Sequence, residues 1–232
     1  MARNLQTIGF DADDTLWHNE RFFKLTQDRF EELLSDYTDV SQLHDRLVAA
    51  EKRNIGQYGF GVKGFVLSMI ETAVDVTDGA VPGHVIRKIL DAGQDMLAHP
   101  IELLPHARTT VTALSDTHRL VLITKGDLLH QERKLAQSGL GDLFDDVAIV
   151  SEKTVATYLT AFAGHPGGTE AAMMVGNSMR SDVVPAVAAG AWGVFVPHAL
   201  EWDLEKADPP EAPRYRSIAD LGDLPALVDY IG

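Results

Sequence analysis

The chain has 232 residues, of which 45% are hydrophobic and 23% charged, a balance typical of a globular protein and not of a disordered or fibrous one. Its formal net charge is −14 and its Lys and Arg residues form no cluster, which argues against nucleic acid and acidic membrane surfaces as partners. It contains no cysteine, so disulfides, thiolate catalysis and zinc–thiolate sites are excluded.

The N-terminal residues carry no export pattern, because Met1 to Thr7 lead directly into a strand pattern without an apolar segment and a cleavage site. No apolar run approaches the roughly 20 residues needed to cross a bilayer. We therefore expect a soluble, cytoplasmic protein with no membrane partner. Nothing in the pattern favours a monomer over a dimer.

The first strand pattern ends abruptly in a run of acids. Ile8-Gly9-Phe10 is apolar, and Asp11, Asp13, Asp14 and Thr15 follow within five positions. Carboxylates this close repel one another unless a metal, a lysine or a shared proton offsets their charge. The cluster therefore indicates a functional site.

Residues 18–99 show apolar positions at helical spacing and no convincing strand. The pattern predicts helices near 22–34 and 43–50, then a glycine-rich loop at 54–64. Further helices are expected at 65–76 and from Pro82 to about residue 98. This segment is predicted to be an all-helical domain.

From residue 100 onwards, helices alternate with short apolar strands. Strands are predicted at 120–124, 147–150, 172–175 and 192–196, with helices near 105–117, 129–138, 154–162 and 183–189. A last short strand or turn and a closing helix are expected within 218–231. Continuous apolar strands between helices predict a doubly wound α/β core with a parallel sheet, made of residues 1–17 and 100–232 and interrupted by the helical domain 18–99.

Polar residues follow the predicted strands, and in parallel sheets such residues converge beyond the carboxyl ends of the strands. Thr124, Lys125 and Gly126 follow one strand, Lys153 follows the next, and Asn177 and Asp182 follow a third. Carboxylate and amide oxygens suit Mg²⁺, which shares its ligand shell with phosphate oxygens. The pattern therefore predicts a site for a phosphoryl group.

These segments resemble motifs I to IV of the haloacid dehalogenase superfamily. Asp11-Ala12-Asp13-Asp14-Thr15 is similar to motif I, Thr124 to motif II, Lys153 to motif III, and Gly176-Asn177-Ser178 with Asp182 to motif IV. The order of the four motifs is also that of the superfamily. The helical segment resembles its first-type cap, whose sequence is less diagnostic.

The resemblance implies a Mg²⁺-dependent phosphatase acting on a small phosphorylated metabolite. Asp11 would be the nucleophile that forms an aspartyl-phosphate, and Asp13 the acid and base. Thr124 and Lys153 would stabilise the transferring group, with Thr15, Lys125 and Gly126 near the substrate. The metal ligands would be Asp11, the Asp13 carbonyl, Asn177 and Asp182. Asn177 stands where many relatives have aspartate, which leaves direct or water-mediated binding open.

Several alternatives use the same residues. Dehalogenases lack an acid at the position of Asp13, because attack on carbon with halide departure needs no protonation of the leaving group, so Asp13 favours phosphoryl chemistry. A phosphomutase on the same core remains an alternative. From a different class, a receiver-like or non-catalytic phosphoryl-binding protein would lack the paired motif of Asp11 and Asp13 or the helical cap.

Simpler interpretations apply to individual residues. Asp13 and Asp14 are also placed to cap a following helix, for Asp14 the favoured interpretation, and Lys153 could be a surface lysine. Tyr58, Phe60 and Lys63 are candidates for a lid that reads the leaving group, or for a plain hairpin between helices. His18 lies just past motif I, but no second histidine at metal-ligand spacing accompanies it.

Overall fold

A computed structural model describes residues 5–232, and residues 1–4, which belong to the stretch searched for an export signal, lie outside the described part. The described residues divide into two compact units. The α/β unit holds the residues up to Glu20, Ile101–Lys125 and Gln131–Gly232. The helical unit holds Arg21–Pro100 and Gly126–His130. The helical unit thus takes in residues 126–130, which the predicted helical domain does not include.

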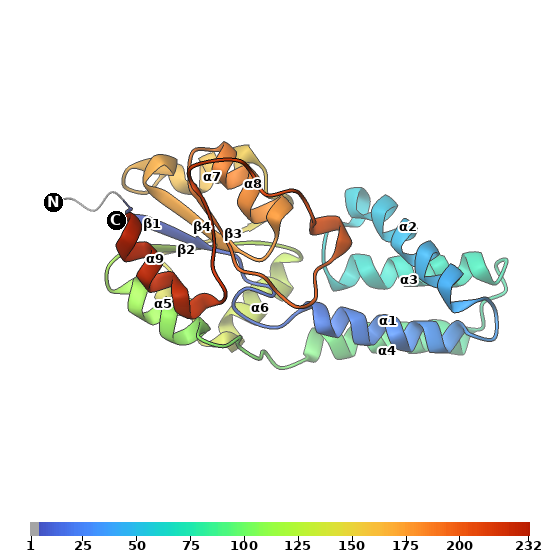
Figure 1. The fold of residues 1–232 in the computed structure, drawn as a ribbon. Helices are drawn as coiled ribbons and strands as arrows, with labels where there is room; N and C mark the ends of the chain where they lie inside the picture. The colour runs from blue at the N-terminus through green and yellow to red at the C-terminus, as the bar shows by residue number, and fades with distance from the viewer. Residues whose placement is uncertain (1–4) are drawn as a thin grey trace. The chain divides into compact units, whose positions relative to one another are not determined.

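The α/β unit is built on one parallel six-stranded sheet in the order β3-β2-β1-β4-β5-β6 (Figure 1). The strands are β1 Thr7–Phe10, β2 Arg119–Lys125, β3 Asp146–Val150, β4 Ala172–Gly176, β5 Trp192–Phe195 and β6 Tyr215–Ser217. The chain leaves β1 for β2 on one side and later returns to β4 on the other side. This order confirms the predicted doubly wound fold and puts a topological switch point between β1 and β4.

Alternate residues of each central strand point to opposite faces of the sheet. Leu120 and Leu122 of β2 pack in one core cluster with α5 (Ala107–Ser115) and α9 (Leu224–Ile231). Val121 and Ile123 pack in a second cluster with α7 (Val155–Ala163) and α8 (Val184–Ala188). Figure 1 shows α5 and α9 on one face of the sheet and α7 and α8 on the other. Both faces of the sheet are therefore covered, and its chemistry is confined to the strand ends.

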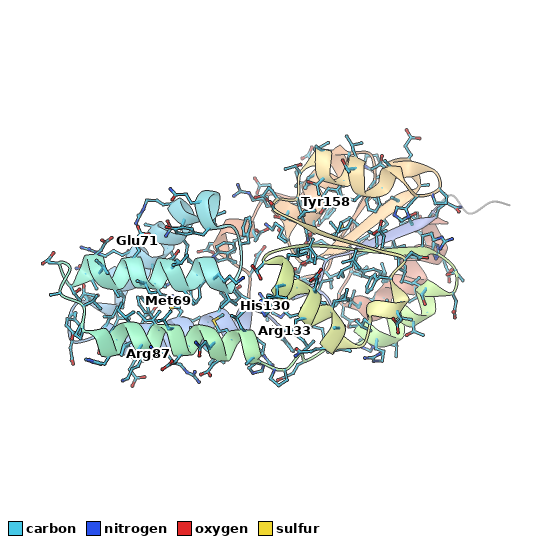
Figure 2. The ribbon with its side chains drawn as sticks, turned by 180° about the vertical axis from the view of Figure 1, so that it is seen from behind. Met69, Glu71, Arg87, His130, Arg133 and Tyr158 are labelled. Carbon is cyan, nitrogen blue, oxygen red and sulfur yellow. The ribbon has the colours of Figure 1, made fainter. Side chains whose placement is uncertain are left out.

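The helical unit contains α1 (Glu20–Leu34), α2 (Val40–Tyr58), α3 (Val62–Val76) and α4 (Gly83–Ala98). Apolar residues of all four helices share one core, with Met69 fully buried among them (Figure 2). Gly93 of α4 permits close packing, because a Cβ there would lie 2.4 Å from Cγ2 of Val66 on α3. Among residues 5–232, no helix combines the length and apolar character needed to cross a bilayer.

Two predicted boundaries are wrong. Residues 54–58, predicted as loop, complete α2, since the buried Asn54 side chain donates to Ser68 Oγ and to Glu71 on α3, and these contacts fix the helix despite its glycine. The segment from 179 begins as a π-helical turn, Met179–Val183, before α8. The last strand, β6, lies just before the predicted closing segment 218–231. The helix predicted at 129–138 is confirmed as α6 (Leu128–Ser138).

Candidate active site

The candidate site lies in the α/β unit at the carboxyl ends of four strands. Asp11 follows β1, Thr124 lies at the end of β2, Lys153 follows β3, and Asp182 follows β4 after one turn. All four side chains are buried. The structure therefore brings together polar residues from four separate segments at the switch point, where parallel sheets bind ligands.

The Lys153 ammonium lies between two carboxylates. Its Nζ donates to Oδ1 of Asp11 and, at 2.6 Å, to Oδ1 of Asp182. The Lys153 side chain is 2% exposed and that of Asp182 is 0% exposed, so Lys153 is not the surface lysine of the simpler interpretation. Burial raises the pKa of Asp11 to about 7, the Lys153 charge opposes this rise, and the Asp182 charge adds to it. Lys153 is therefore the group that most strongly opposes protonation of Asp11.

Asp182 reaches this position because Gly176 has no side chain. A Cβ on Gly176 would lie 2.2 Å from Oδ2 of Asp182, which no real contact allows. The same Oδ2 accepts a hydrogen bond from the backbone N–H of Ser178 at 2.9 Å. The glycine of Gly176-Asn177-Ser178 is thus required by the approach of Asp182 to the strand end.

An oxygen cluster lies beside Asp11. The Oγ1 of Thr15 accepts from the backbone N–H of Asn177 at 3.0 Å. One end of the Asn177 side-chain amide lies 3.0 Å from the Asp13 carbonyl oxygen and 3.2 Å from Oδ2 of Asp11. If the Asn177 amide nitrogen faces the Asp13 carbonyl and Asp11 Oδ2, it donates a hydrogen bond to each of them. If the Asn177 amide oxygen faces them instead, the three oxygens form a set of hard ligands. These residues therefore fit Mg²⁺.

Asp13 occupies a separate network. Its carboxylate accepts hydrogen bonds from Trp17 Nε1 at 2.7 Å, from Lys134 Nζ at 2.6 and 2.8 Å, and from Gln131 at 3.1 Å. Burial raises the pKa of Asp13, but the Lys134 charge and the hydrogen bonds of Lys134, Trp17 and Gln131 outweigh burial, and the pKa lies below its usual value. Asp13 caps no helix, so the simpler interpretation of this residue is wrong.

Gln131 and Lys134 were not among the predicted site residues. Both lie on α6 and are buried, and Gln131 also donates to Thr124 Oγ1 at 2.7 Å. It thereby joins the motif II threonine to Asp13. The available signal was the helical spacing in α6, because positions 131, 134 and 138 share one side of the helix and are all buried.

Lys125 lies 2.8 Å from Ser181 Oγ and 2.6 Å from a carboxylate oxygen of Glu205. Glu205 also accepts from Ser178 Oγ at 2.5 Å. Burial raises the pKa of Glu205, but the Lys125 charge and the hydrogen bonds of Lys125, Ser178 and Ser181 together outweigh burial, and the net shift is downwards. Sequence reasoning missed Glu205, which lies in a short helical turn after β5. Lys125 is therefore held in an ion pair next to the motif IV turn.

Gly126 belongs to the helical unit, where its φ of 128° requires a glycine. Its predicted role at the phosphoryl group stays a prediction. Asp14 caps the start of α1, because its carboxylate accepts the backbone N–H groups of Asn19 at 2.9 Å and Glu20 at 2.8 Å. The favoured interpretation of Asp14 as a cap agrees with this geometry.

Comparison with known proteins gives one family. Residues 5–190 match the model of the haloacid dehalogenase-like hydrolases. A haloacid dehalogenase-like family hydrolase from Xanthomonas campestris is 40% identical, with a TM-score of 0.89, and the match covers 99% of this chain and 93% of that one. No curated protein matches the chain.

More distant solved structures share the fold. A 2-haloacid dehalogenase from Pseudomonas syringae is 20% identical with a TM-score of 0.63, covering 98% of this chain and 100% of that one. A predicted phosphoglycolate phosphatase from Haemophilus somnus is 17% identical with a TM-score of 0.63, covering 98% and 99%. A dehalogenase and a predicted phosphatase are thus both similar to this chain at the level of the fold alone. The match over residues 5–190 and the 40% identity make this chain a member of the haloacid dehalogenase-like hydrolase family.

Proposed function

We propose that this hydrolase is a Mg²⁺-dependent phosphatase that cleaves a small phosphorylated metabolite through an aspartyl-phosphate on Asp11. The observation that carries the proposal is the Asp13 carboxylate, two residues after Asp11. Three side chains donate hydrogen bonds to it, namely Trp17, Gln131 and Lys134. Phosphate ester cleavage needs a proton for the leaving oxygen, whereas halide departure from carbon does not. A site in which hydrogen bonds fix a second carboxylate beside the nucleophile favours phosphoryl transfer.

Asp11 supplies the nucleophile. Lys153 donates to its Oδ1, while Oδ2 faces the oxygen cluster of Asn177 and the Asp13 carbonyl. We assign attack on phosphorus to Oδ1 and metal binding to Oδ2. Lys153 opposes protonation of Asp11 and balances the charge of the transferring group. Bound Mg²⁺ would be held by Asp11, the Asp13 carbonyl, Asn177 and Asp182 and would supply charge neutralisation at the phosphoryl oxygens.

Asp13 carries the proton in both half-reactions. In its protonated form it donates to the leaving oxygen as the P–O bond breaks, and as a carboxylate it then removes a proton from the water that hydrolyses the phosphorylated Asp11. The Lys134 ammonium favours the carboxylate form, which is the form needed in the second step. Thr124, linked to Asp13 through Gln131, donates to the transferring group.

The test compares phosphate release with halide release. Purified protein should release phosphate from p-nitrophenyl phosphate only with Mg²⁺, and Asp11→Asn should lower the rate by at least about 1,000-fold because no nucleophile remains. Asp13→Asn should lower it by roughly 100- to 10,000-fold. Asp229→Asn, on the exposed side of α9, is the matched control and should leave the rate unchanged. Halide release from 2-chloropropionate without phosphate release would overturn the proposal.

A further inference from the structure

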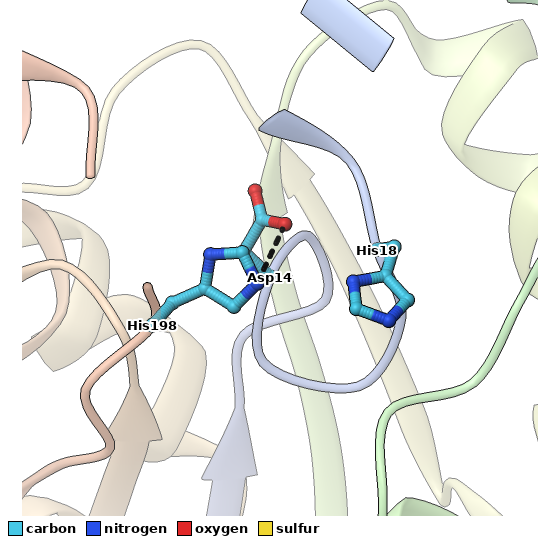
Figure 3. Close-up of side chains that lie close together, drawn as sticks. All are labelled: Asp14, His18 and His198. Carbon is cyan, nitrogen blue, oxygen red and sulfur yellow. Dashed lines mark ion pairs between the residues drawn. The ribbon is translucent and has the colours of Figure 1, made fainter. Parts of the chain in front are cut away.

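Two histidines and an aspartate gather beside motif I. Asp14 and His18 lie on the segment after β1, and His198 lies on the segment after β5, about 180 positions further along the chain. One ligand atom from each residue lies within 4.8 Å of the other two (Figure 3). The rings of His18 and His198 meet edge to face with centroids 6.0 Å apart. His198 is thus the second histidine that sequence spacing did not reveal.

The hydrogen bonding of His198 prepares one ring nitrogen as a ligand. Its Nδ1 lies 2.9 Å from the Leu200 carbonyl oxygen and 3.4 Å from the Leu200 backbone nitrogen. The shorter contact assigns the hydrogen to Nδ1, because a carbonyl only accepts. In the neutral ring the lone pair is then on Nε2, which lies 3.6 Å from Oδ1 of Asp14. A histidine held through its other nitrogen by a carbonyl is the usual arrangement of a metal ligand.

The distance of 3.6 Å between His198 Nε2 and Asp14 Oδ1 distinguishes a direct hydrogen bond from shared metal coordination. It is too long for a hydrogen bond between nitrogen and oxygen. Two ligands of a tetrahedral ion, each about 2.0–2.1 Å from the metal, lie about 3.3 Å apart. The Asp14–His198 separation therefore fits shared coordination better than direct bonding.

Asp14 is fixed in the same way. Its two oxygens accept the backbone N–H groups of Asn19 and Glu20, which orient the carboxylate and leave each oxygen a further lone pair. Its left-handed backbone, with φ of 59°, turns the chain so that His18 can return to the same place. The carboxylate is buried, while both imidazoles are partly exposed, which leaves a path for an ion.

We propose that Asp14, His18 and His198 form a Zn²⁺-type site distinct from the oxygen cluster at Asp11. Two imidazole nitrogens and one carboxylate oxygen are the ligands of zinc and similar transition metals, whereas Mg²⁺ prefers oxygen alone. Three protein ligands leave a fourth position for water. A bound ion joins the segment after β5 to the motif I segment that carries Asp13.

Equilibrium dialysis of the full chain against Zn²⁺, with a large excess of Mg²⁺ to occupy the oxygen cluster, tests the site without substrate. The wild type should bind one Zn²⁺, and His18→Gln and His198→Gln should each weaken binding by at least about tenfold. His165→Gln is the matched control, because His165 faces Asp146 at 3.9 Å and belongs to no group of three candidate ligands within residues 5–232, and it should bind as the wild type does. Absence of Zn²⁺ binding by the wild type, or undiminished binding in both test variants, would overturn the proposal.

A second measurement guards against loss of binding through misfolding. The chain has no cysteine, so His198→Cys introduces its sole thiol. With Co²⁺ in place of Zn²⁺, this variant should show a near-ultraviolet sulfur-to-cobalt charge-transfer band that the wild type and His165→Cys lack. Circular dichroism should match the wild type. A folded His198→Cys variant without the band would contradict coordination at residue 198.

Discussion

The two units treat charge in opposite ways. The α/β unit buries Lys153 between Asp11 and Asp182, with side chains 2%, 9% and 0% exposed. In the helical unit, ion pairs such as Lys24–Asp28 and Arg87–Asp91 join side chains that are more than half exposed. Its buried hydroxyls instead donate to the backbone of their own helix, as Ser68 and Thr72 do.

This difference separates stability from chemistry. Burying an ion pair costs desolvation free energy that the attraction between the two charges barely offsets. Apolar side chains at the same positions would therefore stabilise the fold at least as well. The helical unit does so, with Leu43, Leu47 and Met69 at its centre. The α/β unit keeps buried charge only at the strand ends, where the proposed reaction needs it. Four experiments test this contrast.

The largest effect is expected for Lys153→Met, which removes the cation but keeps the length of the side chain. Asp11 and Asp182 are then left without their partner, which should lower the free energy of unfolding by about 3–5 kcal/mol. The pKa of Asp11, already raised to about 7, rises further, so the proposed nucleophile is protonated at neutral pH. Phosphate release should fall roughly 100- to 1,000-fold or more. Chemical denaturation and steady-state kinetics measure the two losses.

The loss of unfolding free energy in Lys153→Met should depend on pH, and the raised pKa of Asp11 sets the direction of that dependence. A carboxylate whose folded pKa is raised stabilises the fold least at high pH, because the folded state binds the extra proton only below that pKa. Measured with EDTA, the destabilisation should be smaller near pH 5 than near pH 8. Lys206→Met, at an exposed pair with Asp203, is the control. Equal destabilisation by both variants would mean that burial does not set the strength of these ion pairs.

The next effect is expected for Leu47→Ala in the helical unit. Leu47 is 1% exposed in the shared core, so truncation should cost about 2–5 kcal/mol through lost burial and a cavity. Below its melting temperature, this variant should hydrolyse p-nitrophenyl phosphate far better than Lys153→Met does. Leu90→Ala, at a position 36% exposed on α4, should cost well below Leu47→Ala. Thermal melts followed by circular dichroism compare the pair, and an unchanged melting temperature for Leu47→Ala would contradict the assigned core.

Part of the candidate site could be predicted from where the apolar strand patterns end. Apolar runs ending in polar residues located Asp11, Thr124, Lys153 and Asp182, because in a parallel sheet the end of a strand also fixes where the next side chain lies. The fold followed from the alternation of strands and helices. These inferences needed only local pattern and one rule of topology.

The remainder depended on contacts that local pattern does not encode. Gln131 and Lys134 reach Asp13 because of the register in which α6 packs on the sheet. Glu205 and His198 come from irregular segments after β5, where no period constrains the chain. The end of α2 was mispredicted because the contacts of Asn54 with α3 outweigh the local preference of glycine for a loop.

A third effect, smaller in free energy, is expected for Lys134→Met. Removing the ammonium takes away the main influence that lowers the pKa of Asp13, so that pKa should rise. If Asp13 must be protonated to release the leaving group, activity falls as pH rises through its pKa, and the descending limb of kcat/KM should move to higher pH. Lys88→Met, on the exposed side of α4, is the control. A uniform loss of activity with an unmoved limb would indicate a merely structural role for Lys134.

The smallest effect is expected for the Lys24–Asp28 pair on α1. Its atoms lie 2.8 Å apart, close to the geometry of the Lys153 pairs, but its side chains are 52% and 53% exposed. Water screens such a pair, and lysine placed N-terminal to the acid is the weaker order on a helix, so a double-mutant cycle of Lys24→Ala and Asp28→Ala should give a coupling of about 0.5 kcal/mol or less. The coupling should shrink further in high salt. A coupling above about 1 kcal/mol would mean that exposure does not separate the two kinds of ion pair, and that the charges of the helical unit are held as firmly as those at the strand ends.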